Sequence, residues 1–95
     1  MSSRSLILEV WDSFDESGQI FSSLIYAGPL GDRARQMLGP DAKLRTTIMA
    51  RSHFEGMTIY YKLNGWGEYT TDQPWDHEPY PPEWILQQQG FLDRQ

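Results

Sequence analysis

The residues best suited to acid–base or metal chemistry are the two histidines, each of which stands among carboxylates. His53 lies two residues before Glu55, and His77 lies between Asp76 and Glu78. Imidazole and carboxylate groups are common ligands of divalent metals and common partners in proton transfer. The histidines are candidates for a metal site by residue type alone, because no H-E-x-x-H or comparable ligand spacing is present. The alternative is that Glu55 caps a helix and that the other carboxylates are solvated.

His53 is also a candidate for a lone catalytic base. At the N-terminus of a helix the macrodipole disfavours the charged imidazole, so the neutral form would be available to accept a proton. Three rings nearby in the sequence, Phe54, Tyr61 and Trp66, are able to line a pocket beside it. This pattern describes a small enzyme that needs no cofactor. The competing interpretation is a surface histidine in the first turn of a helix.

Two groups of basic residues are candidates for binding an anion. Gly28-Pro29-Leu30-Gly31 precedes Arg33 and Arg35, and backbone N–H groups with two guanidinium groups suit a phosphate. The spacing matches neither the P-loop nor the dinucleotide fingerprint, and a glycine–proline break between helices explains it equally. The second group is one face of a predicted strand, with Lys43, Arg45 and Arg51 as a basic stripe. These three cations would otherwise be solvated or paired with Glu9 and the acidic tail.

Two further motifs are absent or incomplete. No G-x-S-x-G elbow surrounds any serine, which excludes an ordinary serine hydrolase. The run Pro79-Tyr80-Pro81-Pro82 satisfies P-x-x-P, but Glu78 and Glu83 flank it where a ligand of an SH3 domain usually carries a base. We therefore expect this run to pack on its own domain.

Composition indicates a small folded domain. The 95 residues suffice for one domain, and 39% hydrophobic with 14% aromatic residues means that rings must supply much of the core. The sequence contains no cysteine, which excludes disulfides and thiolate metal sites and suits a reducing compartment. The first apolar run, Leu6 to Leu8, is too short for a signal peptide, and no run has membrane-spanning length. We expect a cytoplasmic protein that has no membrane partner.

The negative charge is concentrated at one end of the sequence. Residues 1–65 contain seven acidic and seven basic residues, whereas residues 66–95 contain six acids and a single arginine. Phosphates repel such an acidic surface, so we do not expect a nucleic-acid partner. A third interpretation is that the acidic tail mimics nucleic acid or masks a basic partner surface, with the stripe of Lys43, Arg45 and Arg51 as its internal docking site.

The first half of the chain is predicted to contain a strand and two helices. Alternation of Leu6, Leu8 and Val10 predicts a strand over residues 5–11 with one apolar face. Ser13 and Glu16 have the spacing of a capping box, which predicts a helix over residues 14–27. A second helix is predicted over residues 30–38, because Gly39 and Pro40 provide the expected stop.

The middle of the chain supports two interpretations. Residues 43–51 alternate as a strand, with Leu44, Thr46, Ile48 and Ala50 on one face. Ser52 and Glu55 then form a second capping box and Gly65 suits a helix end, which favours a helix over residues 53–64. The alternative is a β-hairpin over residues 57–69 that turns at Asn64-Gly65. The helix is preferred because Gly67 would weaken the returning strand.

The C-terminal third is predicted to be an acidic strap, residues 72–95, packed on the body. Four of the six prolines and two of the four tryptophans lie between residues 74 and 84. Proline at this density excludes regular helix and sheet, while the rings argue against disorder. Pro82 is expected to start a short helix that ends at Gly90, with residues 91–95 frayed.

These elements together predict a single α+β domain in two layers, with a short sheet packed against helices. The most consistent function is a non-catalytic protein-interaction or homodimerisation module, because exposed rings at a polar rim are typical of interfaces. The candidate partner-binding rings are Tyr60, Tyr61, Trp66, Tyr69 and Trp75. The alternative is a small-molecule binder or cofactor-free enzyme with a pocket between the central helix and the strap near His53.

Overall fold

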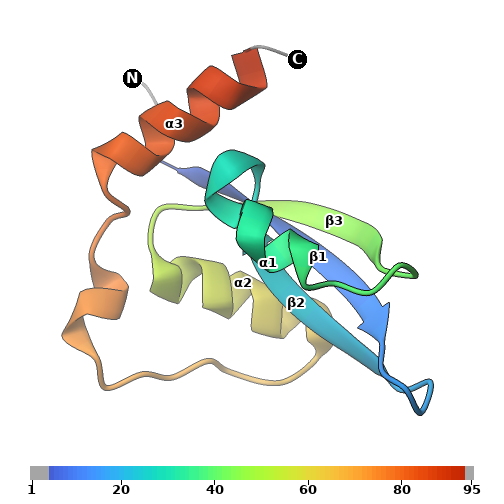
Figure 1. The fold of residues 1–95 in the computed structure, drawn as a ribbon. Coiled ribbons are helices and arrows are strands. Elements are labelled where there is room, and N and C mark those ends of the chain that lie inside the picture. Colours follow the sequence, from blue (N-terminus) through green and yellow to red (C-terminus); the bar gives the residue numbers. More distant parts are fainter. Residues whose placement is uncertain (1–4, 94–95) are drawn as a thin grey trace.

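A three-stranded antiparallel sheet forms the centre of the computed structural model, which describes residues 5–93 (Figure 1). The strands are β1 (Leu6–Phe14), β2 (Ile20–Tyr26) and β3 (Lys43–Ala50), in the order β2-β1-β3. The first strand of the sequence is therefore the middle strand of the sheet. This sheet, with the helices that pack on it, confirms the predicted α+β class.

Helical segments cover both faces of the sheet and one of its ends. The 3₁₀ turn η1 (Gly28–Gly31) and helix α1 (Asp32–Gln36) lie over one face, and helix α2 (His53–Asn64) lies over the other. After a second 3₁₀ turn, η2 (Pro74–His77), helix α3 (Pro82–Asp93) packs against η1 at the end of the sheet (Figure 1). None of the helices in residues 5–93 is long and apolar enough to cross a membrane.

The core lies between the sheet and α2 and follows the alternation of β1. Leu6, Leu8 and Val10 are at most 2% exposed, and they pack with residues of β3, α2, the strap and α3: Ile48, Ala50, Tyr60, Tyr80 and Ile85. Helix α2 approaches closely because Gly56 has no side chain. A Cβ atom there would lie 2.9 Å from Leu8 Cδ1.

The predicted helix over residues 14–27 is wrong, because these residues form a hairpin turn followed by β2. The Asp15 carboxylate accepts hydrogen bonds from the Ser17 backbone N–H (2.9 Å), the Ser17 hydroxyl (2.6 Å) and the Gln19 backbone N–H (2.9 Å). Gly18 completes the turn with a left-handed backbone, φ 85°. The Ser17 hydroxyl and the Gln19 N–H together hold the pKa of Asp15 below its ordinary value. Asp15 thus organises a turn where Ser13 was expected to cap a helix.

The central helix is confirmed with the predicted bounds, and the β-hairpin alternative over residues 57–69 is wrong. The Ser52 hydroxyl accepts a hydrogen bond from the Glu55 backbone N–H at 3.1 Å, and Gly65 ends α2 in the left-handed region at φ 67°. The Glu55 carboxylate accepts a hydrogen bond from the backbone N–H of Arg51, whereas in a capping box the donor would be the backbone N–H of Ser52. The other predicted helix, over residues 30–38, is shorter than expected: η1 is followed by only five residues of α1.

The predicted strand over residues 43–51 is confirmed as β3, but its two faces are not as predicted. A β-bulge interrupts the pairing of β1 with β3: Val10 lies opposite Thr46, whereas Trp11 lies opposite Leu44. Arg45 is therefore the extra residue of β3. Because of the bulge, Leu44 lies on the same face as Met49, and the single alternation expected from the sequence is broken.

The strap predicted over residues 72–95 corresponds to an extended segment, which already begins at residue 65, and to helix α3. The name strap is used from here on for residues 65–81. It is tied to the start of α2 by a bridge between Ser52 and Pro79 and by a hydrogen bond from the Tyr80 N–H to the Arg51 carbonyl (2.9 Å). Helix α3 begins at Pro82 as predicted but continues through Gly90, so fraying from residue 91 is wrong for residues 91–93. Residues 94 and 95 lie outside the described part. The Phe91 ring packs against η1, and its Cδ2 would lie 3.1 Å from a Cβ added to Gly28.

Candidate functional site

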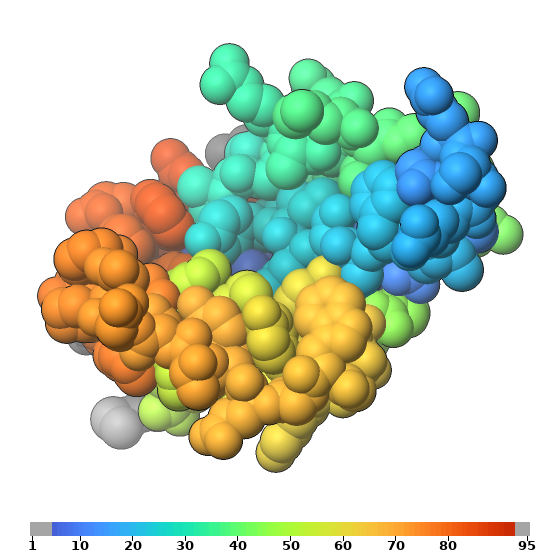
Figure 2. Space-filling view, turned by 90° about the horizontal axis from the view of Figure 1, so that it is seen from below, coloured from blue at the N-terminus to red at the C-terminus, as the bar shows by residue number. Residues whose placement is uncertain are grey.

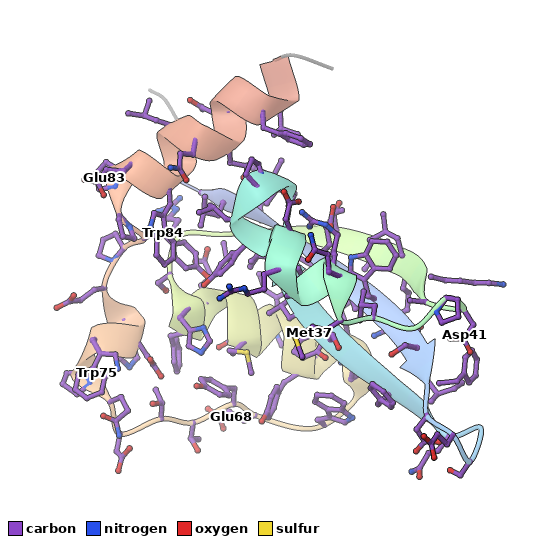
Figure 3. The ribbon with its side chains drawn as sticks, in the orientation of Figure 1. Met37, Asp41, Glu68, Trp75, Glu83 and Trp84 are labelled. Atoms are coloured by element: carbon purple, nitrogen blue, oxygen red, sulfur yellow. The ribbon has the colours of Figure 1, made fainter. Side chains whose placement is uncertain are left out.

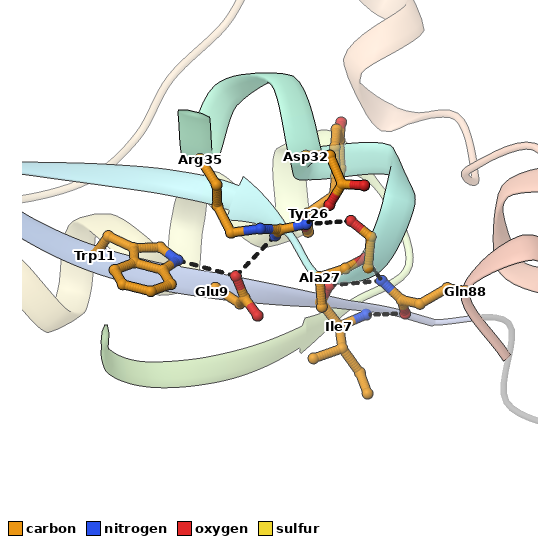
Figure 4. Close-up of polar contacts among 9 residues, drawn as sticks. Ile7, Glu9, Trp11, Tyr26, Ala27, Asp32, Arg35 and Gln88 are labelled. Atoms are coloured by element: carbon orange, nitrogen blue, oxygen red, sulfur yellow. Dashed lines mark hydrogen bonds and ion pairs between the residues drawn. The ribbon is translucent and has the colours of Figure 1, made fainter. Parts of the chain in front are cut away.

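Arg35, one of the two arginines of the predicted anion site, is occupied by contacts within the fold (Figure 4). It donates to the Glu9 carboxylate at 2.9 Å, the Asp32 carboxylate at 2.6 Å and the Tyr26 carbonyl at 2.7 Å, and also to the Gly28 carbonyl. These contacts hold η1 and α1 onto the sheet. Arg33 is exposed on a helix of five residues.

The predicted basic stripe is divided by the β-bulge. Arg45 contacts Asp12 at 3.5 Å and donates to the side chains of Asn64 (2.6 Å) and Ser22 (3.2 Å), on the face covered by α2. Lys43 and Arg51 are exposed and form no ion pair within the described part of the chain. Among the described residues Arg45 therefore pairs with Asp12 and with no acidic residue of the tail.

The two histidines contact rings and do not form a metal centre. The His77 ring lies tilted over the Phe54 ring at a centroid distance of 4.2 Å, and the His53 ring meets the edge of Tyr69 at 6.3 Å. Within residues 5–93, no group of three histidine or carboxylate side chains is arranged to hold a metal ion. His53 is exposed, and no described side chain forms a hydrogen bond with its imidazole, so the geometry contains no nucleophile–base pair.

The predicted partner-binding rings divide into two classes. Tyr60 is 5% exposed and belongs to the core, so it is not available on the surface as expected. Trp66 stands edge-on to both Tyr60 (5.3 Å) and Tyr61 (5.4 Å), and Tyr69 packs on Tyr61 at 5.2 Å. These rings therefore bind the strap to α2. Trp75 is 63% exposed and forms no ring pair among the described residues.

One open groove lies between α2 and the start of the strap. Its volume is about 610 Å³, and its walls are Thr58, Lys62, Gly65, Gly67, Glu68 and Tyr69. In the space-filling view the strap, yellow to orange, crosses this side of the molecule (Figure 2). The groove has no buried polar group that would orient a ligand.

A second cavity, of about 320 Å³, lies where the strap meets the starts of α2 and α3. Its aromatic walls are Tyr26, Trp75, Tyr80 and Trp84, and its polar lining includes His53, Asp76 and Glu78. Trp75 and Trp84 lie at the same end of the molecule, one on η2 and one on α3 (Figure 3). Sequence reasoning placed a pocket near His53 but missed Tyr26 and Trp84, because Tyr26 was assigned to a helix that does not exist.

The phenols of this cavity remain uncharged at neutral pH. Burial raises the pKa of Tyr26, and burial together with the neighbouring Tyr26 and Glu55 raises the pKa of Tyr80 further. The two tyrosine rings meet edge to face at 5.8 Å, and Trp84 meets the edge of Tyr26 at 5.6 Å. The cavity therefore presents neutral aromatic walls beside two carboxylates.

The third candidate surface is the outer edge of β3. Among residues 5–93, β3 pairs only with β1, so within this part of the chain its other edge carries backbone groups that have no partner strand. Leu44 is 48% exposed and Met49 is 56% exposed, and both lie on the face away from α2. Across the ladder they face Trp11 and Ile7, which are only partly buried. This edge is an apolar strip beside open hydrogen-bonding groups.

The chain matches no protein-family model, no curated protein and no solved structure.

Proposed function

We propose that this protein is a non-catalytic interaction module that forms a homodimer through the edge strand β3. The observation that carries the proposal is the open edge of β3, at which Leu44 and Met49 are about half exposed on one face of the sheet. Edge strands of this kind bind other strands through main-chain hydrogen bonds, and alternate side chains supply the specificity.

A second copy of the chain fits this edge because the bulge at Arg45 places Leu44 and Met49 on one face, on either side of Thr47. In an antiparallel pair of two β3 strands centred on Thr47, with Arg45 bulged out of the ladder in both copies, each Met49 would lie opposite the Leu44 of the other copy. The β-bulge makes this possible, since it returns Leu44 to the face that carries Met49. The pairing would extend the sheet from three strands to six and cover four exposed apolar side chains.

The sequence contains no cysteine, which suits the cytosol, and we propose that compartment for the dimer. We propose neither a nucleic-acid partner nor a membrane partner. The acidic residues of the strap would repel phosphates and anionic head groups alike.

Light scattering coupled to size-exclusion chromatography tests the proposal. We expect a dimer at high micromolar concentration, and we expect Leu44→Lys and Met49→Lys each to yield a folded monomer, because both positions are exposed. Met37→Lys is the matched control, since Met37 is 84% exposed and lies outside the strands. A wild-type monomer at these concentrations would overturn the proposal.

A second pair of variants distinguishes the β3 edge from the exposed tryptophans. Trp66→Ser and Trp75→Ser change the rings that sequence reasoning assigned to a partner and leave β3 intact. We expect both variants to remain dimeric. Dissociation by either of them, with a dimer retained in Leu44→Lys, would place the interface on the strap instead.

The cavity beside His53 supports ligand binding as a second function, because its aromatic and acidic lining is distinct from the β3 edge. We do not extend this to catalysis, since His53 lacks a hydrogen-bonded partner side chain.

A further inference from the structure

We infer that the cavity lined by Tyr26, Trp75 and Trp84 binds a small organic cation of the alkylammonium class, such as a methylated lysine side chain. This inference goes beyond the proposed dimer and is independent of it, because no residue that lines the cavity belongs to β3. It rests on the ring geometry, on the unpaired carboxylates and on the size of the cavity.

The cavity brings four aromatic residues together, and aromatic rings are what cation–π recognition uses. Tyr26 stands edge-on to both Tyr80 and Trp84, and Trp84 lies roughly parallel to Tyr80 at 6.1 Å, so the three rings form a fixed corner. Trp75 on η2 lines the same cavity without touching another ring, so its face is not covered by a described aromatic residue. A quaternary ammonium group is attracted to such faces by the negative potential above each ring.

The carboxylates of the cavity carry charge that no described cation neutralises. Asp76 accepts hydrogen bonds from the Thr71 hydroxyl at 2.8 Å and the Tyr69 hydroxyl at 3.3 Å, both of which are neutral donors. Glu78 forms no side-chain hydrogen bond or ion pair with the described residues. The sequence from residue 63 to residue 93 contains no lysine or arginine. The field at the cavity therefore favours a positive ligand.

The volume limits the ligand to one head group or one side chain. About 320 Å³ is at the lower end of the range for ligand sites in proteins. A zwitterionic head group such as phosphocholine would bring its phosphate toward Asp76 and Glu78, which disfavours it. A methylated lysine side chain of a peptide carries no phosphate, so the acidic lining favours it as the source of the cation.

Titration with tetramethylammonium, followed by NMR of the tryptophan indole N–H signals, tests the inference on the intact protein. We expect the signals of Trp75 and Trp84 to shift with a dissociation constant on the order of 1 mM, since a ligand of five heavy atoms forms few contacts. Neopentyl alcohol, a neutral analogue of similar shape, is the control ligand and should bind about tenfold more weakly. Equal binding of the two probes would overturn the inference.

Variants locate the binding. Trp75→Ala and Glu78→Gln should each weaken tetramethylammonium binding severalfold to tenfold. Their matched controls, Phe21→Ala and Glu83→Gln, change an exposed ring on β2 and an exposed glutamate that do not line the cavity, and should bind as the wild type does. Equal losses in the test and control variants would show a nonspecific effect of charge or aromatic content and would refute the site.

A final comparison identifies the source of the cation. A peptide that carries one trimethyllysine should bind more tightly than the same peptide with unmodified lysine, with arginine, or than free phosphocholine. Tighter binding of the arginine peptide or of phosphocholine would refute the assigned class. The Leu44→Lys monomer should bind the trimethyllysine peptide as well as the wild type does, so failure of the dimer and failure of the cavity are separable.

Discussion

The body of the molecule, residues 5–64, and its C-terminal segment, residues 65–93, are held by different kinds of contact. All three ion pairs of the described residues lie in the body: Arg35–Glu9, Arg35–Asp32 and Arg45–Asp12. The backbone hydrogen bonds of the sheet and the Ser52 cap of α2 also hold the body together. In the C-terminal segment no acidic residue between 66 and 92 forms an ion pair with a described residue.

Rings and one buried amide hold the C-terminal segment instead. Trp66 and Tyr69 pack on α2, Trp84 packs on Tyr26, and the Gln88 amide contacts the sheet. An acidic segment therefore need not be held on the body of a protein by its charges. Because rings provide the attachment, the carboxylates remain free to act on a ligand.

The largest effect is expected in the body, from Gly31→Ala. The new Cβ would lie 1.9 Å from the Tyr26 carbonyl oxygen and 2.6 Å from Ile25 Cγ2, so β2 or η1 must move. We expect a loss of at least about 3 kcal/mol in the free energy of unfolding, measured by urea denaturation.

Its counterpart in the C-terminal segment is Gly90→Ala in α3, where nothing lies within 4 Å of the new Cβ. Alanine there should stabilise the protein by about 0.5–1 kcal/mol, because glycine is a poor helix former. A destabilised Gly90→Ala together with an unaffected Gly31→Ala would contradict the packing described for both regions.

The next effect concerns the attachment of α3. Gln88 is 3% exposed, accepts from the Ile7 N–H at 2.7 Å, and donates to the carbonyls of Ile7 (2.9 Å) and Ala27 (3.0 Å). Gln88→Ala removes the partner of the Ile7 N–H and of the Ala27 carbonyl, whereas the Ile7 carbonyl still accepts from the Ala27 N–H at 3.0 Å. The variant should cost about 3 kcal/mol in urea denaturation. Gln87→Ala, an exposed neighbour, should change stability by less than about 0.5 kcal/mol. Equal effects of the two variants would show that α3 is only loosely attached.

Two tryptophan variants separate attachment from recognition within the C-terminal segment. Trp66→Ala removes two edge-on ring contacts and should cost about 1 kcal/mol or slightly more. Trp75→Ala removes no ring contact and should leave stability within about 0.5 kcal/mol. Thermal unfolding followed by circular dichroism checks both, and a larger loss for Trp75→Ala would contradict the distinction.

The smallest effect at neutral pH, and one that grows in alkali, concerns the buried phenols. The pKa of Tyr80 and that of Tyr26 lie above the ordinary value of 10.0 in the folded protein. Their contribution to stability is therefore complete below the unfolded pKa and is lost as the pH rises through the folded pKa. We expect the free energy of unfolding to fall above about pH 10 and Tyr80→Phe to reduce that fall. An identical pH dependence in the wild type and in Tyr80→Phe would show that burial does not hinder ionisation of the Tyr80 phenol.

Local signals were sufficient where both ends of an element were marked by neighbouring residues. Ser52 and Gly65 fix the bounds of α2 through contacts within a few residues, so sequence alone predicted this helix correctly. The apolar face of β1 was equally clear, because Leu6, Leu8 and Val10 alternate over a central strand. Burial of these residues depends little on which partners surround them.

Prediction failed where two local signals competed or where a partner strand decided the outcome. Ser13 and Glu16 suggest a helix cap and Asp15 with Ser17 suggests a turn within the same few residues, and pairing of β2 with β1 decides between them. The β-bulge at Arg45 depends on the register with Val10 and Trp11, which alternation in β3 cannot reveal.

The cavity was located only in part, for the same reason. His53 and the strap were expected to meet, but Tyr26 enters from β2 and Trp84 from α3, far apart in the sequence. Periodicity within one segment contains no information about such convergence. The sequence suggests metal binding, proton transfer or solvation for Asp76 and Glu78, and none of these predicts their place beside Tyr26 and Trp84.

The contacts of Gln88 also bear on the order in which the chain is made and folded. Ile7 and Gln88 are separated by 81 residues, so the first strand to leave the ribosome receives this partner only when synthesis is almost complete. A nascent chain lacking α3 would have the Ile7 N–H and the Ala27 carbonyl without their Gln88 partner, and Gly28 without the Phe91 ring beside it. Final closure of the domain must therefore follow translation, and we expect ribosome-bound chains that end before α3 to be far more sensitive to proteases than the released protein.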